Sequence, residues 1–262
     1  MVFHVLTLFR PFFEGPFGCG IVGRAQTEGK IAIRFHDLRE HTFDRHRSVD
    51  DRPFGGDEGM VLKVEPVFLA LEQIRVLWAA EPAKRTRTLL LSAHGRLFDQ
   101  AAARRLSAYD EIALICGRYE GVDERVAEHL ADEEVSVGSF VLSGGEWACG
   151  VVVDCVTRLL PGVLGNEASS QRESFEAGDG ERVGILDFPH YTRPAKFREW
   201  EVPPVLLSGN HEEVRRWRRR AALEKTWRNR PDLLQTASLS EGDREFLKQL
   251  SAPGREAPER LI

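Results

Sequence analysis

Three glycine-bearing turns follow three candidate β-strands in the first two thirds of the chain. They begin at Leu91, Gly117 and Val137, and charged residues flank each of them. Ligands of open parallel sheets bind beyond the carboxyl ends of the strands, where glycine lets backbone amides and carbonyls come close to them. Any one such turn is more often structural than functional. The three together predict a ligand pocket in which backbone groups make many of the contacts.

A fourth glycine run, Gly18-Cys19-Gly20-Ile21-Val22-Gly23, satisfies the pattern Gly-x-Gly-x-x-Gly, and Asp37 follows the next candidate strand. In dinucleotide-binding folds these glycines come directly after the first strand, because they hold pyrophosphate at a helix N-terminus. Here the segment Arg10–Phe17, with Pro11 and Pro16, separates that strand from the glycines. An NAD-dependent oxidoreductase of the Rossmann type is therefore an alternative interpretation, and the context argues against it.

The pattern of apolar residues predicts the scaffold that holds these turns. Up to Gly165, short β-prone runs alternate with stretches of helical spacing, which favours an α/β fold with a mostly parallel sheet. The expected strands are Phe3–Phe9, Lys30–Phe35, Thr88–Ser92, Glu111–Cys116 and Val135–Leu142. The expected helices are Glu65–Ala80, Gln100–Ala108, Gly121–Ala131 and Glu146–Leu160, the last of which ends before Pro161.

The character of the chain changes after this α/β part, which we assign to residues 1–164. Residues 165–186 are polar and rich in glycine, which predicts a flexible interdomain linker. Residues 187–250 are expected to form a small helical domain, in which Asn210 and Glu213 fit a capping box. Residues 251–262 are expected to be a frayed tail.

Composition and charge narrow the class of protein. The 262 residues are 42% hydrophobic and 29% charged, which is ordinary for a globular protein and excludes a disordered chain. No apolar run approaches the ~20 residues of a membrane helix, and no secretory signal is visible. The four cysteines lack the spacing of a disulfide framework or a zinc site, so we expect a cytoplasmic protein with reduced thiols and no metal site.

The net charge of −5 hides an asymmetry. From Arg193 to Arg230 there are 11 basic and 5 acidic residues, which is a local charge of +6 and leaves −11 for the remainder. A basic block on an acidic chain indicates a polyanionic partner that is contacted through one region, although a solvated helix face would have the same composition.

Longer strings carry a resemblance to a known family. They are DRHRSVDDRPFGG, LSAHGRLFDQ, CGRYEGVDERV, VGSFVLSGGE, PGVLGNEAS, FPHYTRP and EVPPVLLSGNHEEVRRWR. Through them the chain closely resembles, from about Val5 to Leu234, the bacterial tRNA (guanine-N1)-methyltransferases, the TrmD family of the knotted SPOUT class. The resemblance implies a deep trefoil knot, S-adenosylmethionine as methyl donor, a homodimer with active sites at its interface, and methylation of the guanosine immediately 3′ of the anticodon.

The resemblance also assigns a donor pocket to the three turns. The residues it implies are Leu91, Ser92, Gly117, Tyr119, Glu120, Gly121, Val137, Gly138, Phe140, Leu142, Gly144 and Gly145. Glu120 could hold the cationic end of the donor or a helper Mg²⁺; alternatively it could pair with Arg118 or Arg125.

Methylation of guanine N1 makes two chemical demands. A base must remove the N1 proton, for which a carboxylate is suitable, and a fixed guanidinium can stabilise the negative charge that develops on the neighbouring carbonyl oxygen. The resemblance implies that Arg158 is this arginine. Glu173 falls where the family has its catalytic Asp, so the general base is expected to be one methylene longer here. Asp187 matches a further functional acid of the family. The other alternative interpretation of the whole protein is a non-catalytic RNA-binding relative of this family.

RNA contacts are expected at two places. In the N-terminal loop the residues are Arg45, His46 and Arg52, which would touch RNA or the neighbouring subunit; beyond the linker they are Lys196, Arg198, Arg215, Arg216, Arg218 and Arg219. Such contacts to phosphates give affinity rather than sequence choice. The expected partner is the anticodon stem-loop with its target base splayed out, bound at an active site to which both subunits contribute.

Overall fold

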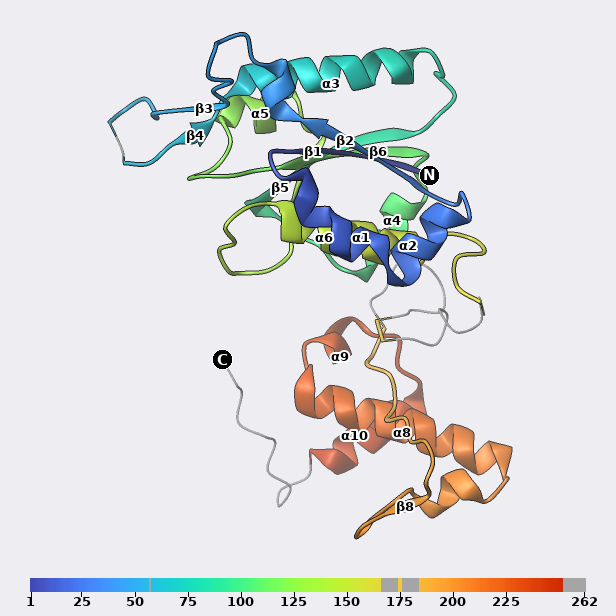
Figure 1. Cartoon of the computed structure of the whole chain (residues 1–262). Coiled ribbons are helices and arrows are strands. Elements are labelled where there is room, and N and C mark those ends of the chain that lie inside the picture. Colours follow the sequence, from blue (N-terminus) through green and yellow to red (C-terminus); the bar gives the residue numbers. More distant parts are fainter. Residues whose placement is uncertain (57, 166–173, 176–183, 252–262) are drawn as a thin grey trace. The chain divides into compact units, whose positions relative to one another are not determined.

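The computed structural model describes residues 1–56, 58–165, 174–175 and 184–251. The chain divides into two compact units, Met1–Gly165 and Asn166–Ile262 (Figure 1). Glu173 and most of the expected linker lie outside the described residues, as does nearly all of the expected tail.

Unit 1 is built on one sheet of five parallel strands, in the order β2-β1-β6-β5-β7. The strands are β1 (Val2–Thr7), β2 (Ala32–Asp37), β5 (Thr86–Leu97), β6 (Glu111–Cys116) and β7 (Glu133–Ser136). The central strands are apolar on both faces: Val5 and Leu114 belong to one core and Leu6 and Ile115 to the other. Buried parallel strands require helices on both faces, so the expected α/β architecture is confirmed.

Helices cover the two faces unequally (Figure 1). One face carries α3 (Val64–Ala79) and α5 (Glu124–His129); the other carries α1 (Glu14–Gly18), α2 (Gly20–Thr27), α4 (Gln100–Ser107) and α6 (Glu146–Thr157). In α6 the residues Val152, Val153 and Val156 are fully buried. The apolar side of this helix is therefore fixed against the sheet, and its amino end is held beside the end of β6.

Several expected boundaries are wrong for identifiable reasons. The strand expected over Val135–Leu142 is β7 (Glu133–Ser136), and the chain leaves the sheet at Gly138, whose φ is +158°. The strand expected over Thr88–Ser92 continues to Leu97 past an irregularity in its pairing with β7. Because Gly95 has no side chain, the backbone of Val135 can pass directly over it.

The Gly18–Gly23 run does not form a phosphate loop. A 3₁₀ turn (Arg10–Phe13) and α1 separate it from β1, and the glycines lie at the end of α1 and in α2. A Cβ at Gly23 would stand 2.8 Å from the carbonyl carbon of Gly18, so close packing of the two short helices accounts for glycine there. A dinucleotide-binding fold requires these glycines directly after β1, and the alternative interpretation loses its basis.

A polar cluster is buried at the amino-terminal end of β1 and β6. The Glu111 carboxylate accepts hydrogen bonds from Trp78 (2.9 Å) and Lys84 (2.8 Å) and lies 2.8 Å from His4 Nε2. The other ring nitrogen of His4 lies 3.0 Å from His36 Nε2. Burial raises the pKa of Glu111, but the hydrogen bonds from Lys84, His4 and Trp78 outweigh it and bring the pKa to about 2.

The described part of unit 2 contains a short hairpin and three helices. Its elements are β8 (Lys196–Phe197), β9 (Trp200–Glu201), a 3₁₀ turn (Pro204–Leu207), α8 (His211–Asn229), α9 (Leu233–Thr236) and α10 (Glu241–Leu250). The side chain of Asn210 caps α8 by accepting hydrogen bonds from the backbone of Glu212 and Glu213. The reciprocal bond expected from Glu213 is replaced by one from the Asn210 amide to Ser208 Oγ. None of the helices in the described ranges is long and apolar enough to cross a membrane.

Candidate functional site

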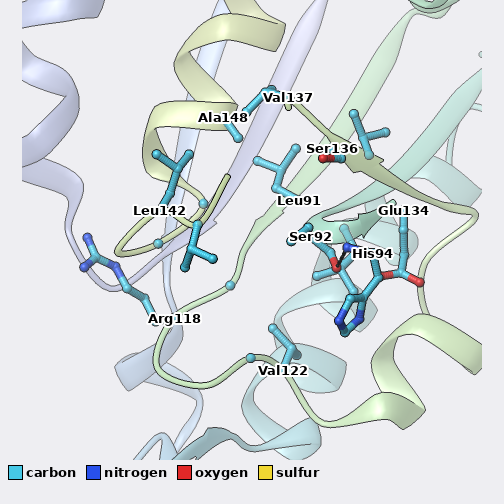
Figure 2. A pocket seen from close by; sticks show the side chains of 18 of the residues that line it. Leu91, Ser92, His94, Arg118, Val122, Glu134, Ser136, Val137, Leu142 and Ala148 are labelled. Carbon is cyan, nitrogen blue, oxygen red and sulfur yellow. Dashed lines mark hydrogen bonds between the residues drawn. The ribbon is translucent and has the colours of Figure 1, made fainter. Parts of the chain in front are cut away.

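The three glycine-bearing segments meet in one pocket (Figure 2). Two of them are turns, after β6 and after β7, as expected. The first expected turn is wrong, because the segment from Leu91 to Arg96 lies inside β5, where the pairing with β7 is interrupted. The three strands are neighbours in the sheet, so the three segments are brought side by side. Leu91 and Ser92 come from β5, Arg118 and Val122 from the turn after β6, and Val137 from the segment after β7 (Figure 2).

Every residue expected in the donor pocket lines this cavity. The full set is Leu91, Ser92, Gly117, Tyr119, Glu120, Gly121, Val137, Gly138, Phe140, Leu142, Gly144 and Gly145. Sequence reasoning missed several polar neighbours, namely His94, Arg118, Glu134 and Ser136. Arg118 lies in the turn after β6, whereas His94 belongs to β5 and Glu134 and Ser136 belong to β7. Adjacency to the glycine-bearing segments was the available signal. His94 is also held by a hydrogen bond from its amide to Ser92 Oγ, 3.1 Å long (Figure 2).

Backbone packing between β6 and α6 requires glycine at position 145. The Gly145 amide donates to the Gly117 carbonyl at 2.8 Å. A Cβ at Gly145 would stand 2.8 Å from Cys116 Cα, closer than side-chain carbons approach backbone atoms. The start of α6 can therefore lie against the end of β6, and Gly117 and Gly145 both line the pocket.

A buried ion pair ties the same two elements together. The Glu146 carboxylate, only 1% exposed, accepts from Arg118 Nε (3.0 Å) and from the Thr7 hydroxyl (2.9 Å). Arg118 also donates to the Ser143 carbonyl at 3.0 Å, and its guanidinium lies 4.3 Å from the centre of the Phe9 ring. One arginine thus positions both the turn after β6 and the segment before α6.

The short hairpin of β3 (Asp50–Asp51) and β4 (Val61–Leu62) supports the turn after β6 from outside. The amide of Glu120 donates to Met60 and that of Leu62 to Gly121, both at 3.0 Å. Tyr119 has a φ of +63°, and burial together with the neighbouring Asp50 carboxylate raises the pKa of its hydroxyl. This left-handed turn is held on both sides and presents backbone groups to the pocket.

The segment after β7 gives the pocket its apolar wall. Val137 and Leu142 lie with Leu91 and Ala148 around the cavity (Figure 2). Val141, in the same segment, is 92% exposed. Apolar faces beside backbone donors and acceptors suit a flat heterocycle whose edges carry polar atoms.

Neither Arg158 nor Asp187, the two expected catalytic residues that the structure describes, is among the residues that line this pocket. Arg158 lies just after α6, about 15 Å along the helix axis from Ala148, a helix residue that lines the cavity. Asp187 belongs to unit 2, where its carboxylate accepts from the amide of Phe188 (2.7 Å) and lies 2.7 Å from His190 Nε2. Glu173 lies outside the described residues.

The alternative partners of Glu120 are engaged elsewhere. Arg118 pairs with Glu146, and Arg125 pairs with Asp123 at 2.7 Å. Within the described ranges, no group of three or more His, Cys, Asp or Glu side chains is arranged to hold a metal ion.

The residues expected to bind RNA fall in both units. Arg45, His46 and Arg52 lie in and beside an exposed turn of unit 1, where the Asp44 carboxylate accepts from the backbone of His46 and Ser48. The others belong to unit 2, and several are already paired within it. Three of them form ion pairs: Lys196 with Glu201, Arg216 with Glu212, and Arg219 with Asp243. The guanidinium groups of Arg198 and Arg218 lie over the rings of Phe197 and Phe188. Arg215 is exposed.

Comparison with known proteins gives a consistent result. Residues 1–236 match the family model described as tRNA (Guanine-1)-methyltransferase TrmD. Relatives named tRNA (guanine-N(1)-)-methyltransferase include a protein of Koribacter versatilis, 55% identical, with 96% of this chain and 99% of the relative covered. Another, from Geobacter metallireducens, is 52% identical with 95% and 98% covered, and one from Geobacter sulfurreducens is 48% identical with 97% and 99% covered.

Proposed function

We propose that this chain, which belongs to the tRNA (guanine-1)-methyltransferase family TrmD, methylates N1 of the guanosine immediately 3′ of the tRNA anticodon. The methyl donor in this proposal is S-adenosylmethionine. The observation that carries it is the meeting of the three glycine-bearing segments in one pocket.

The residues of the pocket fit this donor. Backbone groups at Gly117, Gly121 and Gly138 would bind the edges of adenine, and Val137 and Leu142 would offer apolar surface to its faces. The bound donor supplies an electrophilic methyl group. The protein's own part is to hold that group in one orientation and exclude water, which the fixed contact between β6 and α6 favours.

Two side chains are proposed to act on the base. Glu173 would accept the N1 proton of guanine, and Arg158 would stabilise negative charge on the neighbouring carbonyl oxygen. Asp187 is proposed to support this chemistry by holding His190 and the backbone turn at Phe188.

The separation along α6 favours a homodimer with shared active sites. Arg158 lies too far along the helix to reach the pocket of its own unit 1, so a second copy could supply this group. Trp147 and Val151, one helical turn apart on α6, are 58% and 44% exposed, and Phe12 packs edge-on against Trp147. An exposed apolar patch of this kind is typical of a subunit interface.

We further propose the division of labour expected from the sequence. Residues 1–164 would bind the donor, 165–186 would be a linker that orders over the site, and 187–250 would bind the anticodon stem-loop, followed by a frayed tail. A trefoil knot is favoured by the return of the chain from β7, at the sheet edge, to α6, which abuts the more central β6. A tRNA substrate and four free thiols suit a cytoplasmic enzyme.

Mapping of the product by mass spectrometry tests the proposal. Bulk tRNA treated with the protein and S-adenosylmethionine should gain one methyl group on N1 of that guanosine. A methyl group at another position, or none, would overturn it. Calorimetric titration should give heat with S-adenosylmethionine and none with NAD. Glu173→Gln and Arg158→Ala should each abolish most methyl transfer, whereas a non-catalytic relative would have no activity to lose.

A further inference from the structure

Unit 2 contains a pocket of its own, separate from the residues that line the donor site. It lies between the segment from Phe188 to Arg193, the 3₁₀ turn before α8, and α8 itself. Leu206, Val202 and Val214 contribute apolar surface to it. Among the described residues that line this pocket none is acidic, while Arg193 and Arg218 contribute positive charge.

Arg218 forms one wall of this pocket and is held there by an aromatic ring. Its guanidinium lies 4.8 Å from the centre of the Phe188 ring. Its Nε donor is buried and has no hydrogen-bond partner among the described residues. Buried donors nearly always have acceptors, so this group has bonding capacity that a ligand or a small adjustment around it could use.

Tyr191 provides a second planar surface. Its side chain is 50% exposed although it lines the pocket, and its ring centre lies 6.3 Å from that of Trp217. His190 lies beside the same pocket and is fixed by the Asp187 carboxylate at 2.7 Å. A half-exposed ring, a stacked guanidinium and an apolar floor together form a slot for a flat polar group.

We propose that this pocket binds an unpaired nucleobase of the substrate tRNA, with the base stacked on Tyr191 and a carbonyl oxygen or ring nitrogen accepting from Arg218. The inference rests on the proposed function. Proteins that read single-stranded RNA stack splayed bases on aromatic rings and arginine planes. Arg218 was expected to contact a phosphate, and this proposal assigns it a contact to a base instead. A base contact needs the planar, forked donors of the guanidinium and not only its positive charge.

Variants of the full-length protein separate these two roles. Binding of a tRNA transcript is measured in the presence of S-adenosylhomocysteine, so that no reaction occurs. Tyr191→Leu and Arg218→Lys should each weaken tRNA binding about 5- to 100-fold, and neither should change the slope of affinity against salt. Tyr191→Phe keeps the ring and should restore most of what Tyr191→Leu loses. Arg215→Ala, on the same helix but outside the pocket, should lower the salt slope by about one contact.

A fluorescent base locates the contact directly. Transcripts carrying 2-aminopurine at single positions of the anticodon loop should include one whose fluorescence is quenched by the protein. That quenching should be lost with Tyr191→Leu and kept with Arg215→Ala. The proposal is overturned if Arg218→Lys binds like the wild type, if Tyr191→Phe is as weak as Tyr191→Leu, or if no position is quenched through Tyr191. Failure of the wild type to methylate tRNA would overturn the proposed function itself, and the pocket proposal with it.

Discussion

Substitution of Glu146 should separate the stability of unit 1 from the shape of its pocket. The carboxylate bridges Thr7 and Arg118, and Arg118 holds the carbonyl of Ser143. Glu146→Ala removes one partner of a buried ion pair, which costs about 3–5 kcal/mol. Because the Arg118 side chain is 22% exposed, water can solvate part of the remaining charge, so we expect the lower end, about 3 kcal/mol.

Glu146→Gln keeps the size and one acceptor oxygen, but it removes the second acceptor oxygen and the negative charge that faces Arg118. A hydrogen bond to a charged group contributes about 1.5–3 kcal/mol, which is the expected loss of unfolding free energy. Because Arg118 then loses the carboxylate that orients it, its hydrogen bond to the Ser143 carbonyl should weaken, and binding of S-adenosylmethionine should fall by roughly fivefold to tenfold. Denaturant titration measures the first quantity and calorimetric titration the second.

Glu111→Gln is the matched control. Glu111 is also a buried carboxylate of unit 1, but it lies at the opposite end of β6 from the pocket, about 16 Å away along the strand. It should lower stability at least as much as Glu146→Gln and leave donor affinity unchanged. If both variants weakened donor binding equally, or if Glu146→Gln left it unaltered, the positioning role assigned to Arg118 and Glu146 would be refuted.

Three further outcomes are expected. Burial, with His4 nearby, lowers the pKa of His36 from 6.5 to about 4, and that of Glu111 falls from 4.5 to about 2. In both cases the unfolded chain binds more protons, so the denaturation midpoint should fall as pH drops from 6.5 to 4 and again from 4.5 to 2; a flat profile would contradict this. Gly145→Ala should cost about 1–3 kcal/mol and abolish donor binding measured by calorimetry, because its Cβ meets the backbone of Cys116. Arg158→Ala and Gly145→Ala homodimers should each be inactive. When the two chains are mixed in equal amounts, about half of the dimers are hybrids, and each hybrid has one intact site if the site is shared, so methyl transfer should return at about a quarter of the sites. No recovery would exclude a shared site.

The sequence predicted most accurately the bounds of elements whose side chains are all buried in the core. Glu111–Cys116 was placed at its observed bounds because all of its residues are buried in the sheet. The strand expected over Val135–Leu142 was too long, because an apolar residue in the sequence can be either a core residue or an exposed residue beside a pocket. Val135 is apolar because it lies in the core, whereas Phe140 and Val141 are exposed beside the pocket. A local pattern treats these two situations alike.

Long-range polar contacts had no local signal at all. His4 and Glu111 are 107 positions apart, and Thr7 and Glu146 are 139 apart, yet each pair is joined by a buried contact. Parallel pairing of β1 with β6 places the first pair together, and packing of α6 on the sheet places the second. Only the topology makes these neighbours, so composition and spacing could not have found them.

The same topology explains why all the residues that line the pocket proposed for the donor belong to unit 1, whereas two of the three residues proposed to act on guanine do not. Three adjacent strand ends and the start of α6 form a rigid cradle, and each of its close contacts is made within unit 1. The groups proposed to act on guanine are Arg158, just after α6, and two residues of unit 2, Glu173 and Asp187. We therefore expect this cradle to bind the donor without RNA, whereas methyl transfer is expected to need the side chains of Glu173, Arg158 and Asp187 as well. Donor binding should therefore tolerate changes in those three residues, and methyl transfer should not.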